Sequence, residues 1–311
     1  MSRMNVTLRA WTPADREPLR AALHEPELAP HFDKFLGPEG LEHKLHDRRL
    51  VQAGIRIAEV GGEIAGFGVP WALPQANGVW TMLRVGVRQR FRGRGVGSRL
   101  AEALLAFVRE AGAGAGAIEV AGSAWMPNEA AERLAAKFGF AHERWFWLME
   151  RPRGGAAEPA WPAGIERRTF DHSDPMFADW TAAYNDSFAQ HYRFVVANEE
   201  TGRNLAADPT FAAEGLLLAY RDGRCVGFCR NERHATRGEV GVLGTTHEAR
   251  GIGLGRALLR WGVRWLEANA AGPVTLMVDG DNEGALSLYR SEGFEVARTR
   301  RIWGRAEGRR E

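Results

Sequence analysis

The sequence contains very little cysteine. Only two of its 311 residues are cysteine, Cys225 and Cys229, which is too few for a disulfide framework. They lie four positions apart in a segment that has the pattern of a strand, so we expect two buried thiols on one strand face. Two thiols alone do not make a metal site, and no bound metal is predicted.

Neither sign of charge dominates, and long hydrophobic runs are missing. The 41 basic residues nearly balance the 39 acidic ones, which gives a formal net charge of +2. Nucleic acid is therefore not expected as a partner. The longest weakly polar stretch, residues 111–126, is rich in Gly and Ala and contains Glu119, which argues against a membrane span. No secretory signal pattern is visible, and we expect a cytoplasmic protein.

The sequence does contain an internal repeat. An apolar hairpin pattern, a glycine-rich segment and a segment that starts with Asn-x-x-Ala recur in the same order, about 155–160 residues apart. The first copies span residues 56–69, 90–108 and 128–140, and the second copies span residues 217–230, 248–266 and 282–294. With 45% hydrophobic residues, the chain has enough apolar surface for two cores. The repeat therefore predicts two related domains.

A segment rich in Pro, Gly and Ala separates the two copies and marks a boundary. We predict an N-terminal domain at residues 1–152, a linker at 153–163 and a C-terminal domain at 164–311. Each domain has an α/β pattern, in the order strand, one or more helices, hairpin, strand, helix, strand, helix, strand. In the second domain, apolar spacing predicts a helix over residues 171–187.

A glycine-rich turn follows a predicted strand in each copy and leads directly into a helix. In the second copy, strand 240–245 runs into the turn and a helix over 256–267 follows. Several backbone N–H groups and the positive end of the helix dipole meet there, which is a site for phosphate. The glycine spacing fits neither a P-loop, which ends in Gly-Lys-Ser/Thr, nor a dinucleotide fingerprint.

The residues of these turns resemble a known signature. Arg250-x-x-Gly253-x-Gly255 resembles the acyl-CoA pyrophosphate motif of the GNAT superfamily of N-acetyltransferases, and Arg92-x-x-Gly95-x-Gly97 resembles it again. The segment from Asn282 to Phe294 is similar to the second motif of the family, and residues 128–140 match it except at the tyrosine position. The resemblance implies a mixed α/β fold in two tandem GNAT-like domains. The tandem layout resembles the two-domain members, of which mycothiol synthase is an example.

The resemblance also implies acetyl-CoA as co-substrate and a donor site in each domain, formed by the glycine turn and the strand before it. In the C-terminal domain the implied donor-site residues are Leu243, Thr245, Arg250, Gly251, Gly253, Gly255 and Asn282. In the N-terminal domain they are Val85, Val87, Arg92, Gly93, Gly95 and Gly97.

Acetyl transfer from a thioester to an amine needs a base for the amine and an acid for the departing thiolate. Glu239 lies eleven residues before Arg250, and the resemblance implies that it is the general base and that Tyr289 is the general acid. The corresponding positions of the N-terminal domain hold Thr81 and Ala135. We therefore expect that only the C-terminal domain is catalytic.

The acceptor site is less defined in the sequence. The aromatic residues after the first C-terminal helix either wall an acceptor pocket or pack among themselves, and both readings stay open. They are Phe188, His191, Tyr192 and Phe194. Asn231 and Arg233, after the hairpin, are candidate polar contacts to the acceptor. The basic segment from Arg298 to Arg310 is expected to be a solvated end, and the alternative is that it lines the mouth of the CoA site.

These features predict an enzyme that moves acetyl from acetyl-CoA to a primary amine of a small molecule by direct attack. One alternative is a non-catalytic protein that binds or senses acyl-CoA, and a narrower one is mycothiol synthase itself. The sequence predicts no nucleic-acid or membrane partner, and it leaves a monomer and a homodimer equally open.

Overall fold

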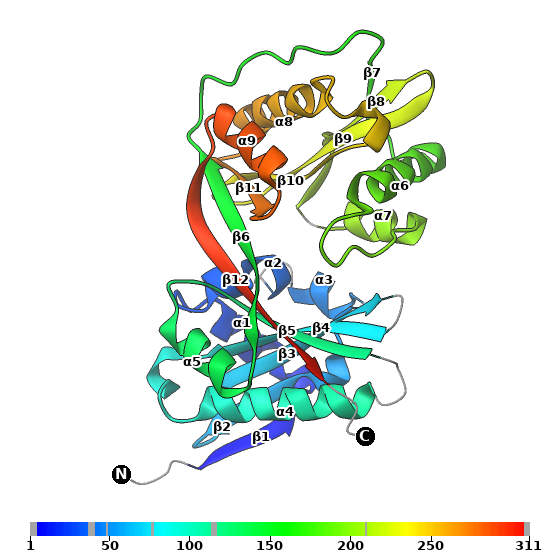
Figure 1. Cartoon of the computed structure of the whole chain (residues 1–311). Coiled ribbons are helices and arrows are strands. Elements are labelled where there is room, and N and C mark those ends of the chain that lie inside the picture. Colours follow the sequence, from blue (N-terminus) through cyan, green and yellow to red (C-terminus); the bar gives the residue numbers. More distant parts are fainter. Residues whose placement is uncertain are drawn as a thin grey trace. The chain divides into compact units, whose positions relative to one another are not determined.

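The structure, a computed structural model, describes residues 5–36, 41–47, 49–75, 78–112, 117–208 and 210–307 (Figure 1). Two compact units make up the chain. Unit 1 comprises Met1–Arg144 and Arg300–Glu311, and unit 2 comprises Trp145–Thr299.

Unit 1 is an α/β unit built on one mixed sheet. Its elements are β1 (Val6–Ala10), α1 (Arg16–Leu23), α2 (Ala29–Leu36), α3 (Leu41–Leu45), β2 (Arg56–Val60), β3 (Glu63–Gln75), β4 (Gly78–Val87), α4 (Val96–Ala111), β5 (Ala117–Met126) and α5 (Glu129–Lys137). Its strand order is β1-β2-β3-β4-β5-β12, where β12 is the last strand of the chain (Glu295–Glu307). Strands β4 and β5 run parallel, and β1 to β4 are antiparallel neighbours.

Unit 2 repeats this pattern. Its elements are β6 (Ala141–Arg151), β7 (Glu166–Thr169), α6 (Asp174–Phe188), α7 (Glu199–Ala206), β8 (Phe211–Arg221), β9 (Arg224–Arg233), β10 (Gly238–Thr245), α8 (Leu254–Asn269), β11 (Val274–Asp279) and α9 (Glu283–Ser291). Its strand order is β6-β11-β10-β9-β8-β7, and β10 and β11 form the parallel pair. The predicted class and the predicted order of elements are confirmed in both units.

The two halves of the sequence exchange their last strands. Strand β6, from the first half, pairs antiparallel with β11 and completes the sheet of unit 2. Strand β12, from the second half, lies next to β5 in the sheet of unit 1. The boundaries of the compact units therefore fall at Trp145 and Arg300 and differ from the predicted boundaries at 152 and 164. A sheet strand is placed by pairing with its neighbours, which the order of segments in the sequence does not reveal.

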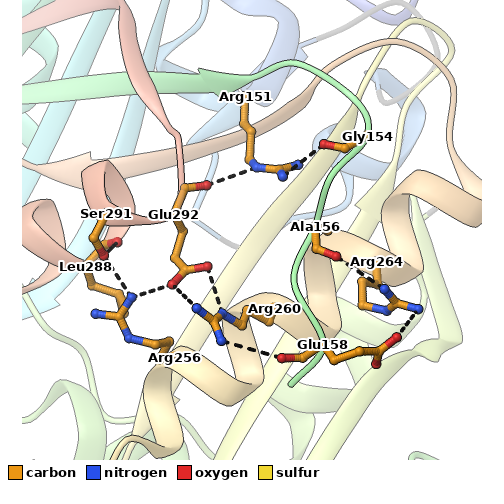
Figure 2. Close-up of polar contacts among 10 residues, drawn as sticks. All are labelled: Arg151, Gly154, Ala156, Glu158, Arg256, Arg260, Arg264, Leu288, Ser291 and Glu292. Carbon is orange, nitrogen blue, oxygen red and sulfur yellow. Dashed lines mark hydrogen bonds and ion pairs between the residues drawn. The ribbon is translucent and has the colours of Figure 1, made fainter. Parts of the chain in front are cut away.

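Residues 153–163, predicted to be a linker, lie along α8 as part of unit 2. Arg264 Nη1 donates a hydrogen bond to the backbone oxygen of Ala156 at 3.2 Å and forms an ion pair with Glu158 at 2.6 Å (Figure 2). Trp161 packs on the cluster beneath α8. A small, open hollow lies between this segment and α8, lined in part by Leu259 and Val263.

Each face of the sheet in unit 2 has its own core. On the α8 face, Cys229, Val240, Leu258 and their neighbours form one buried cluster. On the opposite face, α6 packs Phe177 and Trp180 against strand residues of β8 and β9. The two faces matter for the site because the sheet separates Glu239 on one face from Tyr289 on the other.

Two smaller predictions are wrong. Cys225 packs on the α6 face and Cys229 on the α8 face, because a bulge in β9 at Val226 reverses the alternation between them. Burial raises the pKa of the Cys225 thiol to about 12, and both cysteines are free. The segment from Arg298, expected to be a solvated end, belongs to β12 through residue 307, where Arg300 Nη2 donates to Ser123 Oγ at 3.0 Å.

Among the residues that the structure describes, no helix is both long and apolar enough to cross a membrane.

Candidate active site

Strand β10 has a bulge and diverges from its parallel neighbour β11. One extra residue, Gly241, lies between the residues of β10 that pair with Asn231 and Arg230 on β9. Pairing between β10 and β11 covers only Gly238–Val240, whereas pairing with β9 continues to Thr245. The second half of β10 thus has one edge from which β11 has departed.

Two backbone N–H groups point toward that edge. The N–H of Thr246 donates to the Val226 oxygen on β9 at 3.0 Å. Successive N–H groups alternate between the two edges of a strand, so those of Leu243 and Thr245 point away from β9. Both residues are predicted donor-site residues, and their amides are placed to pair with an extended ligand.

The glycine turn after β10 has the geometry of an anion site. Gly251 and Gly253 have φ angles of +78° and +87°, and Gly253 is the N-cap of α8. Side chains rarely adopt these angles, so the turn needs glycine. The first N–H groups of α8 and its dipole face the same point, which favours a phosphate. Arg250 is exposed, and its Nη2 donates to the Ser187 oxygen at the end of α6, at 3.2 Å.

The third glycine of the turn, Gly255, is already helical. A Cβ atom there would lie 3.8 Å from Thr245 and 3.9 Å from Leu288, which are ordinary contacts. The packing of the chain itself therefore does not require glycine at this position, and the contact of Gly255 with the donor stays a prediction.

Asn282 caps the helix that contains Tyr289. Its Oδ1 accepts a hydrogen bond from the Ala285 N–H at 3.1 Å, at the start of α9. The structure thus gives Asn282 a local role in starting α9, and its contact with the donor stays a prediction.

Tyr289 lies half-buried on the α8 face of the sheet. Its ring packs on the apolar cluster beneath α8 and lies 6.1 Å from the ring of Phe294. Burial, with a smaller contribution from the nearby Cys229 thiol, raises the pKa of Tyr289 to about 12. Cys229 is the direct partner of Leu243, so the phenol lies near the stretch of β10 whose amides face the open edge. The hydroxyl is protonated at neutral pH, as an acid requires.

Glu239 is buried on the other face of β10 and stands directly opposite a second carboxylate. It is 1% exposed, and its partner across the strand pair is Glu232, which is 8% exposed. Opposite residues of an antiparallel pair share a face, so the two carboxylates are neighbours. A Cβ atom at Gly241 would lie 2.4 Å from Glu232 Oε1, so glycine at the bulge makes room for this carboxylate.

Three cationic side chains lie against the carboxylate pair. Arg230 Nη2 is 2.6 Å from Glu232, and Arg237 Nη2 is 3.5 Å from Glu239. His234 Nε2 is 3.4 Å from a carboxylate oxygen of each glutamate. Burial of the imidazole opposes its protonation, but the two carboxylates outweigh this effect and raise the pKa of His234 to about 9. We refer to these five residues as the carboxylate cluster.

One carboxylate oxygen from each glutamate and one nitrogen of His234 lie within 4.8 Å of one another, which is close enough for a shared metal ion. The guanidinium groups of Arg230 and Arg237 already contact the same carboxylates. Because a divalent ion there would be repelled by both arginines, the surroundings favour a cluster of ion pairs over a metal centre.

Sequence reasoning missed Glu232 and His234. It selected Asn231 and Arg233, which the pairing of β9 places on the α8 face. Asn231 is fully buried opposite Val240, and Arg233 contacts Glu214 at 3.4 Å. Both side chains therefore lie on the face opposite that of Glu239. The sequence held one signal that could have found them: residues directly opposite Glu239 in the β9–β10 hairpin share its face. Using that signal requires the register of the hairpin and the position of the bulge, which the sequence does not show.

An aromatic group covers the Glu239 face beside the end of α6. The Tyr184 ring lies 4.9 Å from that of Phe188 and 6.1 Å from that of Phe194, and His191 contacts Phe188 at 5.5 Å. Tyr192 instead lies 6.3 Å from Phe146 on β6. The structure brings together three of the four predicted aromatics, and a wall of a pocket and simple packing are both compatible with their contacts.

An ion-pair network joins the end of α9 to the start of α8 (Figure 2). Glu292 accepts from Arg260 Nε at 2.9 Å and also pairs with Arg256, next to the glycine turn. Its backbone oxygen accepts from Arg151 Nε at 2.9 Å. These contacts connect α9, which contains Tyr289, to α8, which follows the anion turn. The connection is made at Glu292, three residues after Tyr289.

Unit 1 has the same glycine turn and open strand edge, without a counterpart of Glu239 or Tyr289. Gly93 and Gly95 have φ angles of +73° and +84°. Strand β4 parts from β5 after Leu83, and the Arg88 N–H donates to Ala65, so the N–H groups of Val85 and Val87 face the open edge. Thr81, which sequence spacing assigns to the position of the base, is buried opposite Ala72. Because β4 has no bulge, Thr81 shares the α4 face with Leu83, whereas Glu239 lies on the face away from α8. Ala135 stands at the position of the tyrosine. Arg92 Nε donates to the Val87 oxygen at 3.1 Å.

A strand edge with outward amides, followed by an anion turn, is arranged to hold the arm and the pyrophosphate of an acyl-CoA, and it defines the class as an acyl-CoA-dependent N-acyltransferase. The chain belongs to the acetyltransferase (GNAT) family, whose model matches residues 13–140 and again residues 167–294. It is an acetyl-CoA-dependent N-acetyltransferase.

Curated relatives support this assignment. The chain is 35% identical over 242 residues to a mycothiol acetyltransferase of Thermobispora bispora, which covers 75% of this chain and 77% of that protein. It is 36% identical over 217 residues to a mycothiol acetyltransferase of Streptomyces avermitilis, with 68% of each chain covered.

Solved structures show the same fold. A GCN5-related N-acetyltransferase from Sphaerobacter thermophilus has a TM-score of 0.74 at 23% identity and covers 97% of this chain and 95% of its own. A tandem GNAT protein from the clavulanic acid biosynthesis pathway has a TM-score of 0.73 at 16% identity, with 99% and 100% covered.

Proposed function

We propose that unit 2 transfers acetyl from acetyl-CoA to the primary amine of a small molecule, with Glu239 as general base and Tyr289 as general acid. The observation that supports this most is the asymmetry between the units. Both have the anion turn and the open strand edge, but only unit 2 has a buried carboxylate on one face of that strand and a tyrosine on the other.

The donor occupies the gap between β10 and β11. Its pyrophosphate meets the N–H groups at the start of α8, with Arg250 beside it, and its amide-containing arm pairs with Leu243 and Thr245. This places the thioester near the bulge, where the faces of Glu239 and Tyr289 meet. Backbone N–H groups at the open edge stabilise the oxyanion of the tetrahedral intermediate.

Glu239 accepts the proton of the attacking amine. An alkyl ammonium has a pKa near 10.4, so at neutral pH the amine needs a base to become a nucleophile. The nitrogen lone pair then forms the new bond to the acetyl carbon, and the carbon–sulfur bond breaks.

Tyr289 donates its O–H to the departing sulfur. The pKa of its hydroxyl is about 12, above that of a thiol, which is near 8.5. Full proton transfer to a free thiolate is therefore uphill, and the hydroxyl acts first as a hydrogen-bond donor to the negative charge that develops on sulfur.

The acceptor that the relatives favour is the amine acetylated to form mycothiol, a cysteinyl amine attached to an inositol-glucosamine. Support comes from the two relatives named above, each about 35% identical over two thirds or more of the chain. Unit 1 binds acetyl-CoA without transferring it, since neither proton-transfer residue is present.

The test is an acceptor panel scored by release of free CoA from the full chain. The panel contains the cysteinyl amide of glucosaminyl-inositol, an aminoglycoside, a polyamine, a free amino acid and a peptide N-terminus. We expect one amine to exceed the others by at least about tenfold, and the cysteinyl amide to be that amine.

Glu239→Gln is the matched catalytic variant. It keeps the size of the side chain, so we expect unchanged acetyl-CoA binding and a fall in turnover of roughly 10²–10⁴. Full turnover in Glu239→Gln would contradict the role of the base. Equal CoA release with every amine would contradict a specific acceptor site in unit 2.

A further inference from the structure

The carboxylate cluster raises an electrostatic problem for a base. Glu239 and Glu232 stand opposite each other, 1% and 8% exposed, in a position where water screens them poorly. When two carboxylates share a buried site, the pKa of one of them rises strongly and it becomes protonated. A protonated Glu239 cannot accept the proton of an amine.

The three cations of the cluster offset the repulsion between the two carboxylates, and each has a different position relative to them. Arg230 lies on the Glu232 side at 2.6 Å, and Arg237 lies on the Glu239 side at 3.5 Å. His234 Nε2 is 3.4 Å from each of the two carboxylates, so one imidazolium faces both negative charges. Its side chain is 19% exposed and can exchange its proton with water.

The fold holds His234 in this place. The backbone N–H of His234 donates a hydrogen bond to the backbone oxygen of Arg237 at 3.0 Å, which closes the turn between β9 and β10. Across the neighbouring strands, Phe211 on β8 pairs with Glu232, and Thr275 on β11 pairs with Glu239, so neither of these strand partners adds a charge.

We propose that His234 is a positioning residue for Glu239, whose protonated ring lies between the two carboxylates and keeps the base ionised and oriented. This inference rests on the proposed function of Glu239 and goes beyond it by assigning the residue that sets the pH range of the base. The raised pKa of His234 agrees with a ring that is charged at neutral pH.

The first test is the pH profile of turnover in the full chain, measured with the panel amine that wild type acetylates fastest. His234→Gln removes the charge, so the acid limb should move up by about one pH unit. Below the wild-type limb, turnover should fall by up to about tenfold, and near pH 9 it should match that of wild type. His234→Arg keeps the charge and should keep the limb in place.

The second test uses the neighbouring carboxylate. Because His234 offsets the charge of Glu232, the double variant His234→Gln/Glu232→Gln should return the acid limb toward its wild-type position. Arg233→Gln is the matched control, since it lies on the same strand but on the other face, and its profile should not change.

Two results would overturn the inference. One is an acid limb that stays in place in His234→Gln, and the other is a loss that is equal at every pH, which indicates a structural role alone. Full activity in Glu239→Gln would instead remove the base itself, so the two failures are distinguishable.

A third measurement needs no acceptor and no His234 variant. Imidazole NMR of the full chain should show His234 titrating well above the ordinary value of about 6.5, and the midpoint should drop in Glu239→Gln. A wild-type midpoint at the ordinary value would overturn the inference even if His234→Gln fails to fold.

Discussion

The two units share a glycine turn and an open strand edge, and they differ in the side chains that the strand before the turn holds. Both have positive-φ glycines before a helix and a strand edge with outward amides. In unit 2 the strand has a bulge and a buried carboxylate pair, whereas β4 of unit 1 pairs with β3 without a shift and holds Thr81 opposite Ala72. The backbone features thus recur in both units, whereas the carboxylate and the tyrosine to which we assign proton transfer belong to unit 2 alone among the described residues at these positions.

Among the variants that test this comparison, we expect the largest effect from a substitution in the glycine turn that both units share. Gly255→Asp places a carboxylate at the anion turn, where the new side chain has room and favours the start of α8. Repulsion of the pyrophosphate should lower kcat/KM for acetyl-CoA by about a hundredfold or more, since like charges near a protein surface repel by several kcal/mol at contact. Steady-state kinetics over a range of acetyl-CoA concentrations measures it.

Gly97→Asp is the matched variant in unit 1. A Cβ atom there meets Val87 at 3.6 Å, so the substitution fits equally well. Turnover should stay within about twofold, while calorimetry should lose one acetyl-CoA site per chain. A fall in turnover as large as that of Gly255→Asp would show that unit 1 takes part in catalysis.

The exchange of β6 and β12 changes how the units are to be compared. Residues 1–152 alone lack β12, and residues 164–311 alone lack β6, so neither fragment contains all strands of its sheet. Activity of a separated half is therefore no test of a unit, and each variant belongs in the full chain.

Local signals in the sequence account for what could be predicted. The order of elements, helix α6 and the two glycine turns follow from periodicity and from residue types that act over a few positions. Glu239 and Tyr289 were selected because the sequence resembles the family at those positions, and the structure places them on opposite faces of the sheet. The acetyl-CoA contacts and both catalytic roles stay predictions.

What the sequence did not reveal depends on pairing between distant segments. The exchanged strands, the position of Glu232 opposite Glu239 and the opposite faces of the two cysteines all follow from register or from a single bulge. A shift of one residue reverses every side chain beyond it, and no local pattern records that shift.

A smaller effect is expected at Tyr289, the residue to which we assign the role of general acid and which unit 1 lacks. Tyr289→Phe removes only the hydroxyl and keeps the ring beside Phe294, so folding should be unaffected. Loss of the hydrogen bond to the departing sulfur should lower kcat roughly tenfold to a hundredfold, with little change in KM. Ala135→Tyr in unit 1 is the counterpart, and it should add no activity because Thr81 offers no base. An unchanged kcat in Tyr289→Phe would assign the acid elsewhere.

The smallest effect concerns the support of α9. Glu292 is half-buried beside Arg260 and Arg256, and although its desolvation alone would raise the pKa of its carboxyl, those two guanidinium groups hold the pKa below the ordinary value. A lowered pKa means that the ion pairs stabilise the fold above about pH 4.3 and that this contribution is lost as the pH falls further. Glu292→Gln should therefore lower Tm by a few degrees at pH 7 and by progressively less as the pH falls through the lowered pKa of this carboxyl, which thermal melts over a series of acidic pH values measure. Turnover should fall only about two- to fivefold, because α9 loses part of its tie to α8 but keeps the Asn282 cap and the packing of Tyr289.

The control is Glu158→Gln. The carboxylate of Glu158 is exposed and pairs with Arg264, which lies on the same helix as Arg260, so this variant should leave both Tm and turnover unchanged. Equal shifts in the two variants, or a Glu292→Gln difference that grows toward low pH, would contradict the role assigned to this network.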